Sequence, residues 1–306
     1  MGQLLARAFL NDGHDVVILT RRVEANVAGR TVVWDGRSLG DWTRELEAAD
    51  IVINLAGKSV NCRYTAENRR EITQSRVDST NAVGQAIAGA RRPPRLWLQA
   101  ATATIYAHRY DAAHDEVFGV LGGNEENVPE TWRFSIEVAK AWEGAFKQAP
   151  PSPSTRKVLM RSALILSPDP GGIFDVLLGL VRRGLGGRVG DGRQYVSWIH
   201  GADFIWAIYW LVAHKNLEGV INLASPNPVP NAEFMRLLRE AWGTKIGLPA
   251  SKWMLEIATF FMRTETELVL KSRRAIPGRL LHDGFKFEFP DWNDAARDLC
   301  RRWREL

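Results

Sequence analysis

The sequence contains little cysteine. Of its 306 residues only Cys62 and Cys300 are cysteines, and they lie far apart with no paired Cys/His spacing of the kind that binds zinc. This excludes a disulfide framework and a zinc module, and it is typical of a reducing compartment. We therefore expect no metal site, and neither thiol is expected to act as a nucleophile.

Long hydrophobic runs are also missing. The longest run, residues 204–213, is far shorter than the roughly 20 residues that a bilayer span needs. The first residues lack the basic and then apolar pattern of a signal peptide. The sequence therefore predicts a cytoplasmic protein without a membrane partner.

The composition is that of a globular protein, with 45% hydrophobic and 25% charged residues, enough for one large or two modest domains. The net charge is +5. Its basic residues are dispersed in pairs such as Arg69-Arg70 and Arg301-Arg302 and are not gathered with stacking aromatics. A solvated surface or a phosphorylated ligand therefore explains the charge better than nucleic acid does.

Helical and strand patterns alternate through the first half of the chain. An apolar helical face opens the sequence and stops at Asn11-Asp12-Gly13. The apolar patterns then predict strands at 16–19, 31–34, 50–57, 96–100 and 158–166, and helices at 39–48, 65–90 and 131–147. This succession predicts an α/β fold with a Rossmann-type doubly wound parallel sheet.

The pattern loosens after residue 166, where prolines and glycines form a loop. Helices are expected at 173–181, 204–213 with Asp203 as the cap, 234–242 with Asn231 as the cap, 252–262 and 293–303, and strands at 220–223 and 285–289. We expect residues 1–166 to form the cofactor domain, with 200–224 returning to it. Residues 167–199 and 225–306 are expected to form a smaller C-terminal α+β substrate region.

The strand ending in Asn54-Leu55-Ala56-Gly57 carries the strongest site signal. Small residues at its carboxyl edge leave room for a ligand, although buried strands also stop at Ala-Gly for turn geometry. Arg76 lies on the following helix and is expected to face the same edge, although an arginine on a helix is more often at the surface.

The start of the chain resembles the end of a dinucleotide-binding loop, with Gly2 as its last glycine and the helix after it. The strand and earlier glycines expected before it are absent. We interpret this either as a native start that lies upstream or as a loop reduced to Met1-Gly2, which would bind pyrophosphate weakly.

The residues that end the next strand, Thr20-Arg21-Arg22, stand where an acidic ribose ligand would select NAD. Arginine at this position favours a 2′-phosphate, so the predicted cofactor is NADP. Asp35, after the third strand, either accepts a hydrogen bond from the adenine amine or starts a turn with Gly36.

The order of these segments resembles the extended and atypical short-chain dehydrogenase/reductases, and within them the "epimerase family protein" group. The resemblance covers nearly the whole chain. It is carried by Asn54-Leu55-Ala56-Gly57, Ser75-Arg76-Val77, Trp142-Glu143, Gly186-Gly187, the stretch from Gly190 to Gln194, Ser197-Trp198-Ile199-His200, the stretch from Ala224 to Val229, and Arg274-Ala275-Ile276-Pro277.

The resemblance implies a catalytic Ser/Thr and a Tyr-x-x-x-Lys pair. Thr102 stands at the Ser/Thr position, although it could equally be a β-branched residue that closes a strand. Thr102 is also expected to face the cofactor, as are Arg21 and residues 54–57. The pair is missing, because none of the five tyrosines has lysine four residues later. When Trp142-Glu143 is aligned with the family, Ser135 and Ala139 stand at the tyrosine and lysine positions, and Lys140 is one residue out of register.

Other polar residues are therefore candidates for the site. Tyr106 is a candidate acid, with packing against the sheet as its alternative, and His200 has backbone bonding before a helix as its alternative. Arg193, Gln194, Tyr195 and His200 are expected to contact the substrate.

Two functions follow from these patterns. One is an NADP-dependent reductase or epimerase of a small carbonyl or sugar-type substrate, and the other is an NADP-binding sensor or scaffold without turnover. A homodimer through long helices such as 65–90 is common in the superfamily that the chain resembles.

Overall fold

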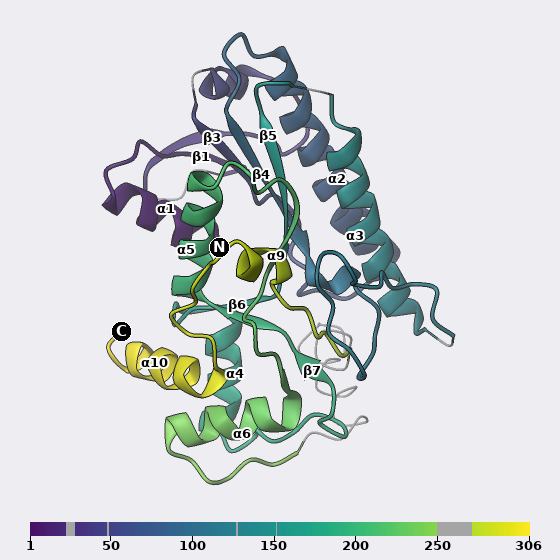
Figure 1. Cartoon of the computed structure of the whole chain (residues 1–306), viewed down its shortest axis with the longest axis vertical. Coiled ribbons are helices and arrows are strands. Elements are labelled where there is room, and N and C mark those ends of the chain that lie inside the picture. Colours follow the sequence, from purple (N-terminus) through teal and green to yellow (C-terminus); the bar gives the residue numbers. More distant parts are fainter. Residues whose placement is uncertain (23–27, 48, 127, 151, 250–270) are drawn as a thin grey trace.

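The computed structural model describes residues 1–22, 28–47, 49–126, 128–150, 152–249 and 271–306. At its centre lies a parallel sheet with the strand order β3-β4-β5-β9 (Figure 1). These strands are β3 (Ile51–Asn54), β4 (Leu96–Thr102), β5 (Arg156–Ser162) and β9 (Gly219–Leu223). The first six residues of β4 are buried, as expected of a strand that is covered on both faces.

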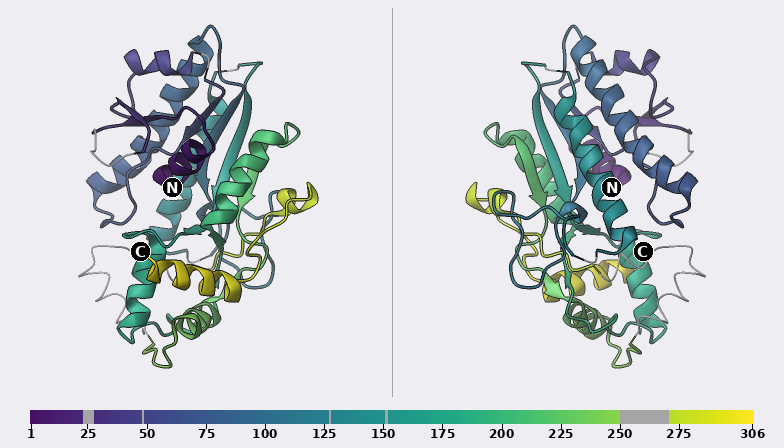
Figure 2. Two further views of the ribbon diagram at one scale, coloured as in Figure 1. Left: turned by 90° about the vertical axis from the view of Figure 1, so that its left-hand side faces the viewer. Right: turned by 90° about the vertical axis from the view of Figure 1, so that its right-hand side faces the viewer.

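Helices cover the two faces of this sheet (Figures 1 and 2). One face carries α2 (Ala66–Gly89) and α3 (Glu130–Gln148), and the other carries α1 (Gly2–Asn11) and α5 (Gly201–Ala213). Successive strand residues point to opposite faces. Trp97 and Leu159 therefore enter the core shared with α2 and α3, while Met160 enters the core shared with α1 and α5. This three-layer arrangement confirms the predicted doubly wound fold.

A separate pair of parallel strands, β1 (Val17–Thr20) and β2 (Arg30–Val33), lies beside the central sheet. Among the described strands, β1 and β3 are not hydrogen-bonded to each other, so the sheet is divided at that point. All four residues of β1 are only partly buried, in contrast to β4. The short 3-10 helix η1 (Asp41–Leu46) stands where the sequence predicted an α-helix over 39–48.

The later part of the chain forms a lobe below the sheet in Figure 1. Its strands pair as β6 with β8 and β7 with β10. Its elements are β6 (Leu164–Leu166), α4 (Ile173–Arg182), β7 (Tyr195–Val196), β8 (Trp198–His200), β10 (Val229–Pro230), α6 (Asn231–Trp242) and α10 (Trp292–Arg304). The short helix α9 (Gly278–His282) packs instead on the central sheet, where Leu280 enters the core shared with α1 and α5.

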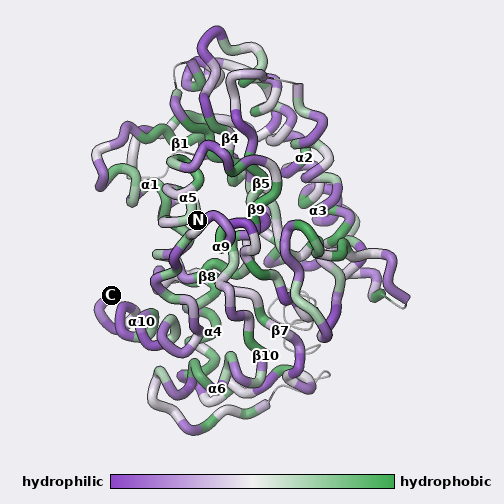
Figure 3. The backbone as a smooth tube through the Cα atoms, viewed as in Figure 1, coloured by the Kyte–Doolittle hydropathy of each residue, from purple (hydrophilic) through white to green (hydrophobic). Residues whose placement is uncertain are grey.

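The core of this lobe is aromatic. The rings of Phe234 and Trp292 stack with centroids 4.0 Å apart, and Trp198 is fully buried beside Trp292. In Figure 3 the strands of the sheet and the segments around β8 are hydrophobic, whereas α10 is largely hydrophilic. Within the described ranges, no helix combines the length and hydropathy that a bilayer span requires.

Several predicted boundaries need correction. The predicted strand 285–289 is not a strand, because the backbone N–H groups of Glu288 and Phe289 donate to the carboxylate of Asp203 and not to a neighbouring strand. Asp203 is therefore not the cap of α5, whose first turn is capped by the Nδ1 atom of His200. The predicted strand 158–166 is broken at Ala163 into β5 and β6.

Two further predictions concern the lobe. Asn231 does not cap α6 but is its first residue, and its Oδ1 atom accepts a hydrogen bond from the N–H of Val189. The predicted helix over 252–262 lies outside the described residues. The division into a cofactor domain and a substrate region stays a prediction, although β9 does pair with β5 in the central sheet.

Candidate cofactor site

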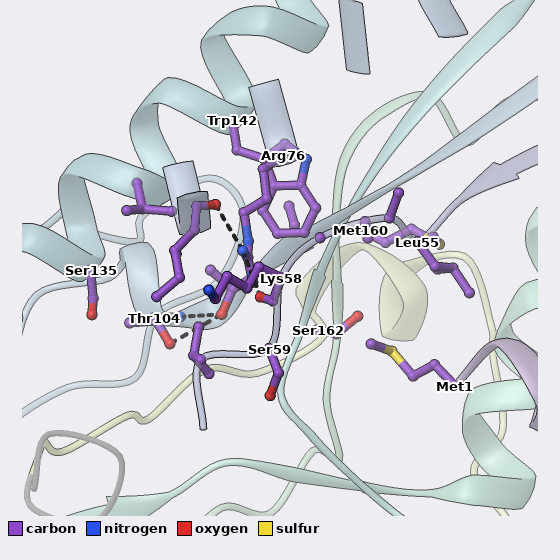
Figure 4. A pocket seen from close by; sticks show the side chains of 18 of the residues that line it. Met1, Leu55, Lys58, Ser59, Arg76, Thr104, Ser135, Trp142, Met160 and Ser162 are labelled. Carbon is purple, nitrogen blue, oxygen red and sulfur yellow. Dashed lines mark hydrogen bonds between the residues drawn. The ribbon is translucent and has the colours of Figure 1, made fainter. Parts of the chain in front are cut away.

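A cavity of about 430 Å³ lies at the carboxyl edge of the central sheet (Figure 4). Its wall is built from the ends of β3, β4 and β5, the start of α1, and parts of α2, α3 and α5. The lining residues include Met1, Leu55, Ala56, Gly57, Lys58, Ser59, Tyr64, Arg76, Thr102, Thr104, Phe134, Ser135, Trp142, Met160, Ser162 and Phe204. This is the edge at which doubly wound sheets bind their ligands.

The end of β3 is shaped by a buried asparagine. The Nδ2 atom of Asn54 donates to Gln99 Oε1 at 3.0 Å, and its Oδ1 atom accepts from the N–H of Ala56 at 3.1 Å. These bonds fix the turn that carries Leu55, Ala56 and Gly57 along the cavity wall. Asn54 itself is buried and does not line the described wall, so it supports the site without facing the ligand space.

Arg76 lies directly behind Gly57. A Cβ atom at Gly57 would stand 3.2 Å from the Cγ and Cζ atoms of Arg76, which is why glycine fits here. The guanidinium donates to the carbonyls of Lys58 and Ile72 at 3.0 and 2.9 Å, and it lies 5.0 Å from the ring centroid of Trp142.

The charge of Arg76 has no carboxylate partner among the described residues. Burial lowers its pKa from the ordinary value, but arginine stays protonated at neutral pH. The wall of the cavity therefore carries a positive charge that protein carboxylates do not neutralise.

Lys58 was not among the residues that the sequence predicted. Its ammonium donates to Asn68 Oδ1 at 2.8 Å and to the carboxylate of Glu71, both on α2. Its backbone N–H donates to Ser75 Oγ at 2.9 Å. The position directly after Ala56-Gly57 was the signal in the sequence that could have found it.

The predicted phosphate residues stand at the end of β1. Arg21 and Arg22 are exposed at the end of β1, and neither lines the described cavity wall. The Oγ1 atom of Thr20 bonds the backbone of Arg22 and so forms the turn. The pKa of Glu71 is lowered chiefly by its hydrogen bond to Lys58, with smaller contributions from the charges of Arg70 and Arg21.

The first turn of α1 completes this end of the site. Met1 lines the cavity, and a Cβ atom at Gly2 would lie 4.0 Å from the side chain of Leu55. The N-terminus of a helix of this length attracts anions. Figure 4 shows Met1 and Leu55 across the cavity from Arg76 and Trp142.

Asp35 is occupied by its own turn. Its Oδ1 atom accepts from the N–H groups of Arg37 and Ser38 at 2.9 and 2.8 Å, and these bonds lower the pKa of the exposed carboxylate. Of the two alternatives in the sequence, this geometry agrees with the turn.

Hydroxyl groups from β4, η2 (Ala103–Ile105), α3 and β5 line the opposite part of the wall. Thr102 Oγ1 accepts from the N–H of Thr104 and lies 3.1 Å from its Oγ1 atom. Ser135 lines the cavity, as its alignment with the family tyrosine implies. Ala139, aligned with the family lysine, is buried in the core, and Lys140 is exposed, so neither supplies an amine to the described wall.

Tyr106 is corrected as a catalytic candidate. It is 1% exposed and does not line the cavity. Its hydroxyl lies 2.8 Å from Asn222 Oδ1 and accepts from Arg161 Nη1 at 3.0 Å, and burial raises its pKa. Of the two roles that the sequence left open for Tyr106, the structure agrees with packing against the sheet.

The predicted substrate residues lie in the lobe, away from the described cavity wall. The guanidinium of Arg193 lies over the ring of Tyr110, Gln194 Nε2 donates to the carbonyl of Val189 at 3.0 Å, and the guanidinium of Arg274 covers the ring of Tyr195. A role of these three in substrate binding stays a prediction.

His200 is corrected, because its ring is committed to structure. It is 2% exposed, it accepts from the N–H of Ala202, and its Nε2 atom lies 3.2 Å from Asp298 Oδ2. Burial lowers its pKa to about 4. The alternative of backbone bonding before a helix is the observed one.

This arrangement defines a Rossmann-type dinucleotide-binding fold, and comparison with known proteins identifies the family. A family model described as the NAD dependent epimerase/dehydratase family matches residues 1–126, and a domain of unknown function, DUF1731, matches residues 250–299. An epimerase family protein of Mycobacterium bovis is 30% identical over 290 residues, which are 94% of this chain and 90% of the relative.

Solved structures agree with this placement. The crystal structure of human epimerase family protein SDR39U1 (isoform 2) with NADPH matches with a TM-score of 0.84 and 26% identity, covering 98% of this chain and 95% of that chain. The bovine SDR39U1 is 28% identical over 303 residues, covering 98% of this chain and 96% of the relative. The chain belongs to the epimerase family proteins. NADP, the cofactor predicted from the arginines after β1, is the one in the human structure.

Proposed function

We propose that this protein binds NADP(H) in the cavity and acts as a reductase or epimerase on a small carbonyl or sugar-type substrate. The observation that carries the proposal is the charge of the cavity. Its described lining includes the cations Lys58 and Arg76 and no Asp or Glu, and it begins at the N-terminus of α1. Such a wall suits a dinucleotide that carries several phosphate charges.

The residues present fit this cofactor. Ala56 and Gly57 allow close approach of a ribose to the backbone, and the cavity volume lies within the roughly 300 to 1,000 Å³ that small-molecule sites occupy. When bound, the nicotinamide supplies or accepts a hydride.

The chain's own residues hold the reactants. The hydroxyls of Thr102, Ser135 and Ser162 line one cavity, and they are suited to bind a substrate carbonyl or hydroxyl oxygen. Apolar residues on the same wall, among them Phe134, Met160 and Phe204, exclude water from the reacting atoms.

Titration with NADPH and NADH, followed by nicotinamide fluorescence, tests the binding. We expect saturable binding with NADPH preferred. A panel of aldehydes, ketones and nucleotide sugars then tests turnover, followed as NADPH loss or, for an epimerase, as product formation. Thr102→Val, which keeps the shape but removes the hydroxyl, is expected to lower the turnover and to leave NADPH binding within about twofold, because its oxygen serves the substrate.

A second candidate function is NADP(H) binding without turnover. It is favoured by the lack of acid/base groups on the described wall, whose lining contains no carboxylate or imidazole and no tyrosine followed by lysine four residues later. This candidate predicts NADPH binding with no reaction of any compound in the panel. If the protein reacts with even one compound, and Thr102→Val abolishes that reaction, the candidate of binding without turnover is excluded.

A further inference from the structure

We propose that Lys58 binds the 2′-phosphate of NADP(H), and that Glu71 is the internal counter-ion that holds Lys58 when no phosphate is present. The pair then sets the preference for NADPH over NADH. This inference rests on the proposed function, since it deepens the same site. It concerns two residues that the sequence did not single out.

The position of Lys58 joins two parts of the site. It follows Ala56-Gly57, the segment expected to lie against a ribose, and it lines the cavity. Its ammonium reaches α2, where Asn68 and Glu71 accept it. Arg21 is exposed at the end of β1, where the sequence predicts the 2′-phosphate. A phosphate held by Lys58 would take the place of the Glu71 carboxylate, at the end of the neighbouring segment that follows β3.

The ion pair is suited to exchange its anion. The side chains of Lys58 and Glu71 are 29% and 48% exposed, and ion pairs exposed to this degree contribute little to stability. A phosphate monoester carries a charge of about −1.5 to −2 at neutral pH and offers three acceptor oxygens. It therefore attracts the ammonium more strongly than one carboxylate does.

Lys58 is better suited to this role than Arg76. The guanidinium of Arg76 is held by two backbone carbonyls and by the ring of Trp142, behind Gly57. The ammonium of Lys58 ends a flexible four-carbon stem and can turn from Glu71 to a ligand without moving the backbone. The N–H of Lys58 and its carbonyl stay fixed by Ser75 and Arg76 during such a movement.

The test compares the dissociation constants of NADPH and NADH for the wild-type protein, Lys58→Ala and Glu71→Gln. For Lys58→Ala we expect NADPH to bind about tenfold more weakly, the effect of losing one charge-assisted hydrogen bond, and NADH to change less than about twofold. For Glu71→Gln we expect NADPH to bind about threefold more tightly, because Lys58 no longer has a competing anion, with NADH unchanged.

Matched controls separate local contacts from net charge. Lys215→Ala removes an exposed lysine in the turn after α5, and Glu67→Gln neutralises an exposed carboxylate one helical turn before Glu71. Both should leave the ratio of the two constants within about twofold.

Three outcomes overturn the inference. Equal weakening of NADPH and NADH by Lys58→Ala would place Lys58 at the part that both cofactors share. No change in the ratio with either variant would remove Lys58 and Glu71 from selectivity, and an equal effect of the controls would assign the result to net charge. If wild-type protein binds neither cofactor, the proposed function fails first, and the two failures are thereby distinguished.

Discussion

Gly57 is a position at which the backbone and a charged side chain are in direct contact. A methyl group there would stand 3.2 Å from two carbon atoms of Arg76, tighter than ordinary packing. Gly57→Ala is therefore expected to displace the guanidinium from the cavity wall and to weaken NADPH binding about tenfold, a typical cost of overpacking being about 1–3 kcal/mol. Fluorescence titration measures the affinity.

Gly89→Ala is the matched control for this prediction. Gly89 is the last residue of α2, and a Cβ atom there meets no atom within 4 Å. The substitution should leave NADPH binding unchanged and raise stability slightly, since alanine is favoured over glycine in helices by about 0.5–1 kcal/mol. Wild-type affinity in Gly57→Ala would contradict the proposed contact.

His200 makes the stability depend on pH. Its pKa is lowered by burial from 6.5 to about 4 in the folded protein. The unfolded chain therefore binds a proton at a higher pH than the folded chain does, and the contribution of the neutral ring is complete above pH 6.5 and is lost as the pH falls toward 4. From pH 7 to pH 5 the loss is about 2 kcal/mol by proton linkage.

Urea unfolding at pH 7 and pH 5 gives the change in the free energy of unfolding, which is compared between the wild type and His200→Asn. Asparagine can cap the first turn of α5 but does not titrate, so its stability should fall less over this range. His14→Asn, at an exposed position after α1, should behave like the wild type. An equal fall in stability for the wild type and His200→Asn would exclude the imidazole as the cause.

At the scale of elements, a buried ion pair joins α3 to β5. Arg161 donates to both carboxylate oxygens of Glu143, at 2.7 and 2.9 Å, and the two side chains are at most 6% exposed. Glu143→Gln leaves the guanidinium buried without its counter-ion. Removing one partner of a buried pair typically costs about 3–5 kcal/mol. We therefore expect the free energy of unfolding of the variant, measured by urea unfolding, to be lower than that of the wild type by this amount.

Glu137→Gln is the control for this prediction, because Glu137 is exposed on the same helix. It should unfold within about 0.5 kcal/mol of the wild type. A Glu143→Gln protein as stable as the control would mean that Arg161 finds another acceptor, of which the hydroxyl of Tyr106 is already one.

The helices and strands with strong apolar periodicity were predicted well. The helix expected over 65–90 is observed as Ala66–Gly89, and the strand expected over 96–100 as Leu96–Thr102, because local patterns fix both. The false strand over 285–289 shows the limit. Its alternation of Phe and charged residues was real, but a strand needs a partner, and here the carboxylate of Asp203 satisfies the backbone instead.

The caps were predicted less well for a similar reason. Asp203 and Asn231 are good N-cap residues by type, but each accepts hydrogen bonds from a distant segment. Residue type shows that a side chain needs donors, and only the tertiary structure shows which donors it meets.

At the scale of the whole molecule, the sequence placed the site at the carboxyl edge of the sheet, because strand order alone determines that edge. Leu55, Ala56, Gly57, Arg76 and Thr102 line the cavity there, as the sequence led us to expect. Lys58 was missed because its orientation depends on Asn68 and Glu71, which lie 10 and 13 residues further along the chain, on α2. A homodimer through α2 stays a prediction that sedimentation measures directly.

Cofactor binding should stabilise the molecule as a unit, since the cavity wall joins α1, α2, α3, α5 and the central sheet. At a free concentration of 100 times the dissociation constant, NADPH should add about 2.7 kcal/mol to the free energy of unfolding. At the same concentration NADH should add less, because it lacks the 2′-phosphate. Thermal unfolding with each cofactor measures the difference.

The difference between the two melting temperatures should depend on salt, because the contacts involved are between partly exposed charges. Raising the salt from about 0.1 M to 1 M reduces the screening length from about 10 to 3 Å and should bring the two melting temperatures together. A difference that salt leaves unchanged would mean that shape, and not the charges of Lys58 and Arg21, distinguishes the two cofactors.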